Sequence, residues 1–394
     1  MDYALQPRIP MSSPDLTEAE REAVLSVLRT PHLSMGPHIR RFETTFRERL
    51  GLRHAIAVNS GTAGLHLCVR AAGVRPGDLV VTTPFSFVAS TNAILFEGGV
   101  PVYVDVDPLT GNLDPQKVRA AVTDLLEGGA TARKWLPPRG ASAKASPKAL
   151  LTVDVFGQPA DADPLLEVAR ARGLKVIEDS CEALGAAYKG RPAGTLGDYG
   201  VFAFYPNKQI TTGEGGMVVT DDDAAADLMR ALRNQGRAPG DTWLAHTHLG
   251  YNYRLDEMSA ALGAVQMSRL DDLLAKRAQV AAWYAERLAA IPGVEPPHVR
   301  PETTRMSWFV YVVRFDPALG RDALIRRLAG EGVPARPYFA PIHLQPYMVE
   351  RFGYRPGAYP VTEDLGRRGA ALPFSGVMTE EQVDAVCAAL RRVL

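Results

Sequence analysis

The fold is decided by the stretch Val201-Phe202-Ala203-Phe204-Tyr205-Pro206-Asn207-Lys208-Gln209-Ile210-Thr211-Thr212-Gly213-Glu214-Gly215-Gly216. Its apolar beginning predicts a strand buried on both faces, as in a parallel sheet. The glycines at its end permit backbone angles and close approaches that other residues resist. Lys208 therefore follows a buried strand into a glycine-rich turn, where a partly dehydrated amine can act as a nucleophile. A lone lysine is more often a solvated surface residue, so this interpretation depends on the motifs upstream.

The composition restricts the class of protein. The chain has 394 residues, of which 46% are hydrophobic, and its 44 basic residues balance 44 acidic ones. We therefore expect about two domains, with no nucleic-acid partner and no contact with an anionic membrane. The cysteines Cys68, Cys181 and Cys387 lack the spacing of a zinc site, which predicts a reducing, cytoplasmic compartment and no metal. Neither a secretion signal nor an apolar run of roughly 18 residues is present, so we expect a cytoplasmic protein without a membrane segment.

Strand and helix patterns alternate along the first 255 residues. An extended arm and helices at about 18–29 and 39–50 are expected first, and the capping box Thr17-x-x-Glu20 begins the former. Seven apolar runs follow, at 55–58, 79–82, 102–106, 150–155, 174–177, 201–204 and 217–220. They predict an α/β fold with a mostly parallel seven-stranded sheet between helices. Ligands of such sheets bind at the carboxyl ends of the strands.

The remaining segments predict the domain organisation. Residues 127–148 are rich in glycine, proline and small residues, which predicts a mobile surface loop. A helical pattern of some 35 residues from 256 to about 290 predicts a bridge between domains, with a kink as an option. After it, a strand at 309–315, a helix at 321–329, a strand near 333–336 and a last helix begun by Thr379-x-x-Gln382 form a smaller α+β unit. We therefore expect a large domain over 1–255, with the N-terminal arm, and a small one over 256–394.

One motif lies at the end of the first predicted strand. Asn59-Ser60-Gly61-Thr62-Ala63-Gly64 follows the first strand, and its small residues would expose backbone amides to a phosphate at a helix N-terminus. Such a turn is often purely structural. No Walker loop and no G-x-G-x-x-G motif is present, so nucleotide hydrolysis and hydride transfer lose their main support.

Acidic and aromatic residues occupy further strand ends. Glu178 and Asp179 end the fifth strand, where both acids would lie over the ligand site, although Asp179 could instead cap a helix. Phe87 follows the second strand and could stack on a planar ring or belong to the core. A phosphate site, a ring-stacking aromatic, a carboxylate and a lysine are the parts that a pyridoxal phosphate enzyme needs.

With these motifs the chain resembles the DegT/DnrJ/EryC1/StrS family of sugar aminotransferases, fold type I, over nearly its whole length. The signatures stand in the family's order: Gly36-Pro37, Asn59-Ser60-Gly61-Thr62, Gly77-Asp78, Glu178-Asp179, Lys208, Gly213-Glu214-Gly215-Gly216, Gly250-Tyr251-Asn252-Tyr253-Arg254, Tyr338 with Pro341 and His343, and Leu372-Pro373. The resemblance implies pyridoxal 5'-phosphate as cofactor.

The resemblance also implies a role for each site residue. Lys208 would carry the internal aldimine and Asp179 would pair with the pyridine nitrogen. Phe87 would stack on the ring. Gly61 and Thr62 would hold the phosphate, Glu182 would lie near the phenolic oxygen, and Asn252 would reach the phosphate of the other subunit of a homodimer.

The implied reaction is a ping-pong transamination. L-glutamate would donate the amino group, and a keto group of a nucleotide-diphosphate sugar would accept it, usually on a 4-keto-6-deoxyhexose and sometimes on a 3-keto sugar. Arg254, Arg336, Tyr338 and His343 would contact the diphosphate, or else serve packing and surface charge. Two other functions stay open: a sugar dehydratase, in which histidine replaces the lysine in relatives of that kind, and a non-catalytic regulatory protein.

Three features depart from the family pattern. Ala203 stands where a phosphate-binding serine is common, and residues 127–148 form a longer insertion than the family predicts. Glu182 is an acid where a neutral or donor group is commoner. Two anions beside one cofactor either raise a pKa or leave Glu182 turned away.

Overall fold

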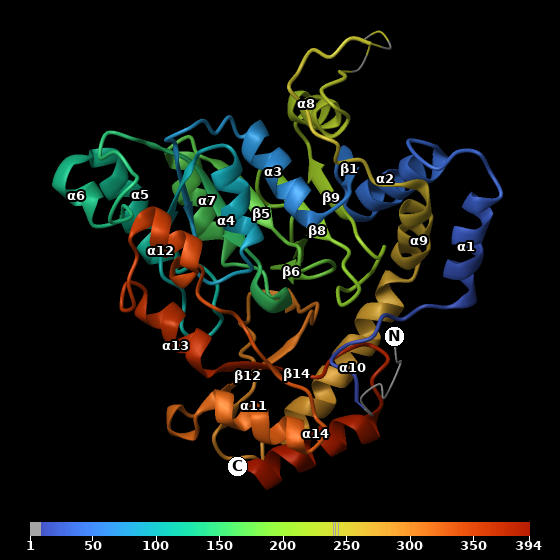
Figure 1. Cartoon of the computed structure of the whole chain (residues 1–394), viewed down its shortest axis with the longest axis vertical. Coiled ribbons are helices and arrows are strands. Elements are labelled where there is room, and N and C mark those ends of the chain that lie inside the picture. Colours follow the sequence, from blue (N-terminus) through green and yellow to red (C-terminus); the bar gives the residue numbers. More distant parts are fainter. Residues whose placement is uncertain (1–8, 239, 241, 243) are drawn as a thin grey trace.

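A seven-stranded sheet forms the centre of the larger part of the molecule (Figure 1). The structure, a computed structural model, describes residues 9–238, 240, 242 and 244–394. The sheet has the order β1-β9-β8-β5-β4-β2-β3. Its strands are β1 (His54–Val58), β2 (Leu79–Thr82), β3 (Val100–Tyr103), β4 (Pro147–Val153), β5 (Lys175–Asp179), β8 (Tyr199–Ala203) and β9 (Gly216–Thr220). Neighbouring strands are parallel except at β9, which is antiparallel to β1 and β8. All seven predicted strands are confirmed, with their ends shifted by a few residues.

Helices cover both faces of this sheet, because successive side chains of a strand point to opposite faces. On β9, Val218 packs into a core with Leu65 and Met229, whereas its neighbour Met217 packs into a different core with Phe42 and Phe46. One face is covered by α3 (Gly61–Ala71), α4 (Ala89–Phe96) and α8 (Asp223–Arg233). The other face is covered by α2 (Pro37–Leu50), α5 (Pro115–Glu127), α7 (Ala162–Ala171) and α9 (Glu257–Ser268).

A smaller antiparallel sheet with the order β10-β12-β14-β13 forms the second part of the molecule. Its strands are β10 (Val294–Glu295), β12 (Tyr311–Phe315), β13 (Arg336–Pro337) and β14 (Gly369–Leu372). The helices α10 (Leu270–Leu288), α11 (Arg321–Gly330) and α14 (Glu380–Val393) pack on it. Ile9 is buried in the same core, and the Met11 carbonyl accepts a 2.9 Å hydrogen bond from the Phe374 amide. The beginning of the described N-terminal arm, at Ile9 and Met11, therefore packs on this smaller part; residues 1–8 lie outside the described residues.

The long helical pattern forms two helices instead of one. Helix α9 ends at Ser268 and α10 begins at Leu270, because Arg269 between them has a ψ of 6°. The Arg269 guanidinium binds the carboxylates of Asp15, at 2.7 Å, and Glu20, at 2.6 Å. In Figure 1, α10 runs from the region of the large sheet into that of the small sheet.

The insertion at 127–148 lies mostly at the surface, in agreement with the predicted surface loop, and its mobility stays a prediction. It contains the short helix α6 (Gly129–Arg133). The Trp135 indole donates a 2.6 Å hydrogen bond to Asp124, and the Arg139 amide donates one of 3.1 Å to the Phe352 carbonyl. The half-buried Trp135 and these two hydrogen bonds attach the insertion to neighbouring elements.

Three further α-helices and one small sheet complete the described part of the chain. They are α1 (Glu18–Leu28), α12 (Pro346–Phe352), α13 (Pro360–Arg368) and a three-stranded sheet of β6 (Ala187–Tyr188), β7 (Arg191–Pro192) and β11 (Thr303–Arg305). Both predicted capping boxes, at Thr17 and Thr379, are confirmed.

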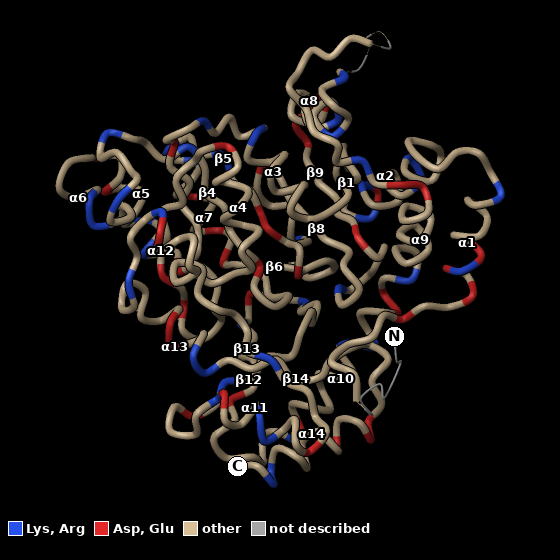
Figure 2. The backbone as a smooth tube through the Cα atoms, viewed as in Figure 1, with Lys and Arg blue, Asp and Glu red and all other residues tan. Residues whose placement is uncertain are grey.

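Charges of both signs are interspersed over both parts of the molecule (Figure 2). Within the described ranges, no helix combines the length and the apolarity that a bilayer crossing would need. The same ranges hold no group of three or more His, Cys, Asp or Glu side chains arranged to bind a metal ion.

Candidate active site

Lys208 lies on the loop that follows β8. The loop returns to the sheet through Gly213, whose φ of 79° favours glycine, and the Phe204 amide then donates a 3.0 Å hydrogen bond to the Gly215 carbonyl. Only 13% of the Lys208 side chain is exposed. Its Nζ atom lies 3.8 Å from the centroid of the Phe309 ring. The amine is therefore largely shielded from water.

Gly61 and Thr62 begin helix α3 directly after β1. Ser60 caps the helix, since its hydroxyl accepts a 3.1 Å hydrogen bond from the Ala63 amide. The other amides of a first helical turn lack partners within the helix and favour an anion. A Cβ atom on Gly61 would lie 2.7 Å from the Ala203 Cβ. Glycine therefore lets this helix N-terminus approach β8 closely.

Asp179 ends β5 and lines the same cavity as the lysine. It is 6% exposed, and its Oδ2 atom accepts a 2.6 Å hydrogen bond from the Ser90 hydroxyl. No helix follows Asp179, so the helix-cap alternative is excluded.

Glu178 points to the opposite face of the sheet, because neighbours on a strand alternate. Its carboxylate accepts hydrogen bonds from the backbone amides of Gly194, Leu196 and Gly197, at 2.5 to 3.1 Å. The prediction that both acids lie over the ligand site is therefore wrong for Glu178. Its carboxylate instead stabilises the loop at 194–197.

Glu182 is turned toward the lysine. Its Oε1 atom lies 3.8 Å from Lys208 Nζ, and its Oε2 atom accepts a 2.9 Å hydrogen bond from the Phe156 amide. Burial raises the pKa of Glu182 to about 7, although the positive charge of Lys208 opposes the shift. Of the two alternatives for this acid, the one in which its side chain is turned away is excluded, since the carboxyl faces the lysine. A carboxyl that binds a proton near neutral pH thus lies beside the amine.

These side chains surround one cavity of about 320 Å³, which is large enough for a small cofactor. Phe87 lies on its wall with 63% of its surface exposed, so its ring is free to receive a planar partner. The cavity is lined by Ser60, Gly61, Thr62, Leu65, Ser86, Phe87, Ala89, Val153, Asp179, Cys181, Glu182, Ala203, Tyr205, Asn207, Lys208, Glu214, Gly215, Phe309 and Tyr338.

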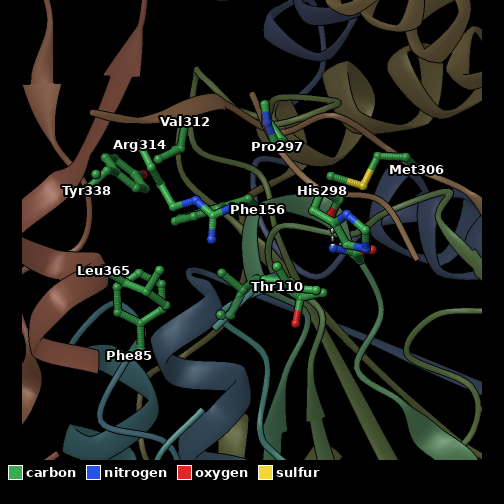
Figure 3. Close-up of a pocket in the computed structure, with 15 residues that line it drawn as sticks. Phe85, Thr110, Phe156, Pro297, His298, Met306, Val312, Arg314, Tyr338 and Leu365 are labelled. Atoms are coloured by element: carbon green, nitrogen blue, oxygen red, sulfur yellow. Dashed lines mark hydrogen bonds between the residues drawn. The ribbon is translucent and has the colours of Figure 1, made fainter. Parts of the chain in front are cut away.

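Tyr338 lines this cavity and also a second one of about 40 Å³ (Figure 3). Phe156, Phe85 and Arg314 surround the smaller cavity with it. Burial raises the pKa of the Tyr338 hydroxyl well above its usual value, and the nearby charge of Glu182 adds to the shift. Tyr338 is therefore a neutral hydroxyl at the edge of the main cavity.

Asn252 and Arg254 lie beside the end of β1 but do not line the cavity. The Asn59 side chain donates a 3.3 Å hydrogen bond to the Asn252 carbonyl, and the Asn59 amide donates one of 2.9 Å to the Tyr253 carbonyl. Arg254 donates a 2.9 Å hydrogen bond to Asn234. The Asn252 residue is exposed, so its side chain is accessible to a second copy of the chain.

The structure does not bring Arg336 and His343 to the cavity. Arg336 is exposed on β13. His343 has no exposed surface, and its Nε2 atom lies 3.0 Å from Glu363. Burial lowers the pKa of His343 although Glu363 opposes the shift. We therefore correct the expectation that His343 contacts the diphosphate, because its side chain is enclosed by protein; the packing alternative holds for it.

Some residues at or beside the cavity were not predicted from the sequence. Ser86 lines the cavity, and Ser90, four residues later, lies behind it on Asp179; the two hydroxyls lie 2.8 Å apart. That spacing beside an acidic strand end could have drawn attention to them. Phe309 comes from a distant segment, and no local pattern indicates it.

The residues around the cavity fit pyridoxal phosphate. The unpaired amides of the α3 N-terminus suit its phosphate, the exposed face of Phe87 suits its ring, and the buried carboxylate of Asp179 suits a protonated ring nitrogen. Lys208 supplies the only lysine amine among the cavity residues.

The family comparison agrees with this arrangement. The model of the DegT/DnrJ/EryC1/StrS aminotransferase family matches residues 14–391. GDP-perosamine synthase of Caulobacter vibrioides is 40% identical over 398 residues, which cover 98% of this chain and 99% of that protein.

Two further relatives point the same way. The putative pyridoxal phosphate-dependent aminotransferase EpsN of Bacillus subtilis is 35% identical over 379 residues, covering 95% of this chain and 93% of that protein. The crystal structure of the aminotransferase TlmJ from Streptoalloteichus hindustanus superposes with a TM-score of 0.85 at 32% identity and covers 98% of each chain.

Proposed function

The chain belongs to the DegT/DnrJ/EryC1/StrS aminotransferase family, and from this premise we propose a specific reaction for it. It is a pyridoxal phosphate-dependent sugar aminotransferase with the type I fold. The proposed donor is L-glutamate, and the proposed acceptor is a keto group of a nucleotide-diphosphate sugar, with a 4-keto-6-deoxyhexose as the expected sugar. The two half-reactions follow one another in a ping-pong order. The observation that carries this proposal is the convergence of Lys208, Asp179 and the α3 N-terminus on one cavity.

Each of these residues has a distinct task. When bound, pyridoxal phosphate supplies an electron sink for charge that develops on carbon. Lys208 would hold the cofactor covalently until the amino group of the donor displaces it. The freed Nζ atom would then take the proton from the α carbon of the donor and deliver it to the cofactor carbon that the amino group now bridges. Asp179, oriented by Ser90, keeps the ring nitrogen protonated through its negative charge. The amides of Gly61 and Thr62 bind the phosphate.

Glu182 can bind a proton beside Lys208 near neutral pH. Because the pKa of Glu182 is raised to about 7, its carboxyl can donate a hydrogen bond to an oxygen at neutral pH, unlike an ordinary carboxylate. The proposed partner is the phenolic oxygen of the cofactor. The 3.8 Å distance to Lys208 Nζ supports this position.

The proposed sugar substrate rests on two observations. The relative with 40% identity is named for a GDP-linked sugar product. Tyr338 lies at the edge of the main cavity, where it can contact a substrate beyond the cofactor. Arg254 and Arg336 lie outside the cavity of their own chain, so we propose them for the diphosphate only across an assembled dimer.

The proposed active unit is a homodimer, in which Asn252 completes the phosphate site of the other subunit. Its exposure, and the position of its segment beside the end of β1, support this arrangement. We propose the cytoplasm as its compartment. The three cysteines are all free thiols, as a reducing compartment would keep them.

A labelling experiment tests the site. Borohydride reduction of the yellow holoenzyme, followed by peptide mapping, is expected to place the pyridoxyl group on Lys208, and a label on Lys189 instead would refute the assignment. Addition of L-glutamate is expected to bleach the visible band. A colourless protein that binds no cofactor would favour a regulatory role.

A substrate panel tests the reaction. The glutamate-treated enzyme is incubated with 4-keto and 3-keto nucleotide sugars, and mass spectrometry detects the amine product. Lys208→Ala serves as the matched inactive control, because it removes the amine and keeps the cavity. Absence of an amine from every keto sugar would contradict the proposed acceptor class.

A further inference from the structure

Arg277 on helix α10 is a buried cation without an acidic partner. Only 4% of the surface of Arg277 is exposed. Among the described residues, no carboxylate forms an ion pair with it, and burial is the one cause that lowers its pKa, to about 10. An isolated buried charge is costly unless hydrogen bonds compensate it. Here four backbone carbonyl oxygens do so.

The four carbonyls belong to the two segments that meet at the lysine amine. One guanidinium nitrogen donates to the carbonyls of Asn207, at 3.1 Å, and Lys208, at 2.7 Å. The other donates to those of Trp308 and Phe309, both at 3.2 Å. The planar guanidinium fixes the relative position of both segments, which a flexible ammonium group cannot do.

The same two segments form the contact at the amine. The Lys208 Nζ atom lies 3.8 Å from the centroid of the Phe309 ring. Trp308 has a φ of 49°, a left-handed conformation that is strained for a bulky residue and needs support from its surroundings. Arg277 supplies part of that support through the Trp308 carbonyl.

We propose that Arg277 is a positioning residue for the transamination: its guanidinium clamps the main chains of Lys208 and Phe309 together and so aims the lysine amine into the cavity. This inference rests on the proposed role of Lys208. Because α10 runs from the core of the large sheet into that of the small one, the clamp also ties the geometry of the amine to the contact between both parts of the molecule.

The experiment compares Arg277→Lys and Arg277→Gln with the wild-type holoenzyme. Arg233→Lys is the matched control, since Arg233 is another buried arginine, bound to Glu43 and to the Ala57 carbonyl, and lies outside the cavity. The readouts are the visible circular dichroism of the bound cofactor, the rate of cofactor capture by the apoenzyme, and kcat and KM for L-glutamate. The circular dichroism signal and kcat are normalised to the amount of cofactor bound per folded chain.

We expect Arg277→Gln to lower kcat and the capture rate roughly 10-fold to 100-fold with KM within about 2-fold, because a misplacement of about 1 Å can cost that much. The visible circular dichroism band of the cofactor in Arg277→Gln should weaken in parallel. In Arg277→Lys, kcat, the capture rate and this band should lie between the values for Arg277→Gln and wild type. Arg233→Lys should lose thermal stability without any of these changes.

Two outcomes overturn the inference. One is unchanged circular dichroism and kcat in folded Arg277 variants, and the other is an equal loss in Arg233→Lys. If Arg277→Gln does not fold, the folded Arg277→Lys variant decides by the same readouts. Failure of the wild-type enzyme to label at Lys208 would refute the proposed function instead, so the two failures are distinguishable.

Discussion

The Oε1 atom of Glu182 lies 3.8 Å from the Nζ atom of Lys208, with 8% and 13% of the two side chains exposed. The two groups share a site that water scarcely reaches, so the positive charge of Lys208 acts strongly on the carboxyl of Glu182. Burial raises the pKa of Glu182 from 4.5 to about 7. This relationship yields a prediction that needs no cofactor.

Glu182→Gln should change how the stability of the apoenzyme depends on pH. Between pH 4.5 and about 7, folded Glu182 binds a proton that the unfolded chain has released, so the free energy of unfolding falls as the pH rises. Glutamine lacks this effect. The variant should therefore gain stability relative to wild type across this window, by at most roughly 3 kcal/mol, and no more above it. Urea unfolding at several pH values measures the difference, and identical pH dependence of both proteins would contradict the raised pKa.

Gly61→Ala should weaken phosphate binding and stability. Its Cβ would lie 2.7 Å from the Ala203 Cβ and 2.9 Å from the Cys181 sulfur, so the helix N-terminus must move away. We expect a loss of about 1–3 kcal/mol in unfolding free energy. Gly330→Ala on α11 is the control, because no atom from outside its own helix and its chain neighbours lies within 4 Å of the added Cβ. Denaturant unfolding and cofactor titration measure both variants, and equal behaviour of the two would disprove the close-approach argument.

Asp179→Asn should keep the fold and greatly reduce turnover. An uncharged amide cannot hold the ring nitrogen protonated, so the electron sink is lost. Ser90→Ala removes the 2.6 Å hydrogen bond to Asp179 but keeps the charge, so its effect on kcat should be smaller. Single-turnover bleaching by L-glutamate gives both rates. Near-normal turnover of Asp179→Asn would mean that Asp179 is structural.

Mixed dimers of Lys208→Ala and Asn252→Ala subunits should regain activity. Each parent is impaired, but a heterodimer contains one site with neither change if Asn252 acts on the neighbouring subunit. Loss of the Asn252 amide should weaken cofactor retention by roughly 1–3 kcal/mol, the cost of an unsatisfied charged acceptor. Activity is measured against mixing ratio after subunit exchange has been verified. Verified heterodimers without recovered activity would show that each site is built within one chain.

Local patterns predicted the large sheet well. Alternating strands and helices, and the glycines around Lys208, act within a few residues of sequence, so each of the seven strands was predictable. Side chains alternate along a strand, so the sequence could also have placed Asp179 and Glu178 on opposite faces of the sheet. The prediction that both acids lie at the ligand site did not use this rule. A kink in the helical pattern from 256 to about 290 was one of the options, but its position at Arg269 was not predictable. The break accompanies ion pairs with Asp15 and Glu20, more than two hundred residues earlier.

The sequence by itself determined which chemical groups this protein carries and which strand ends carry them: the lysine in its glycine-rich turn, the acid at the end of β5 and the amides after β1. The tertiary structure alone decided how these groups are held. Ser90 meets Asp179 across 89 residues, and Arg277 meets Lys208 across 69. The tertiary structure also buries His343 beside Glu363. Such contacts depend on the packing of distant segments, which leaves no periodic signal in the chain.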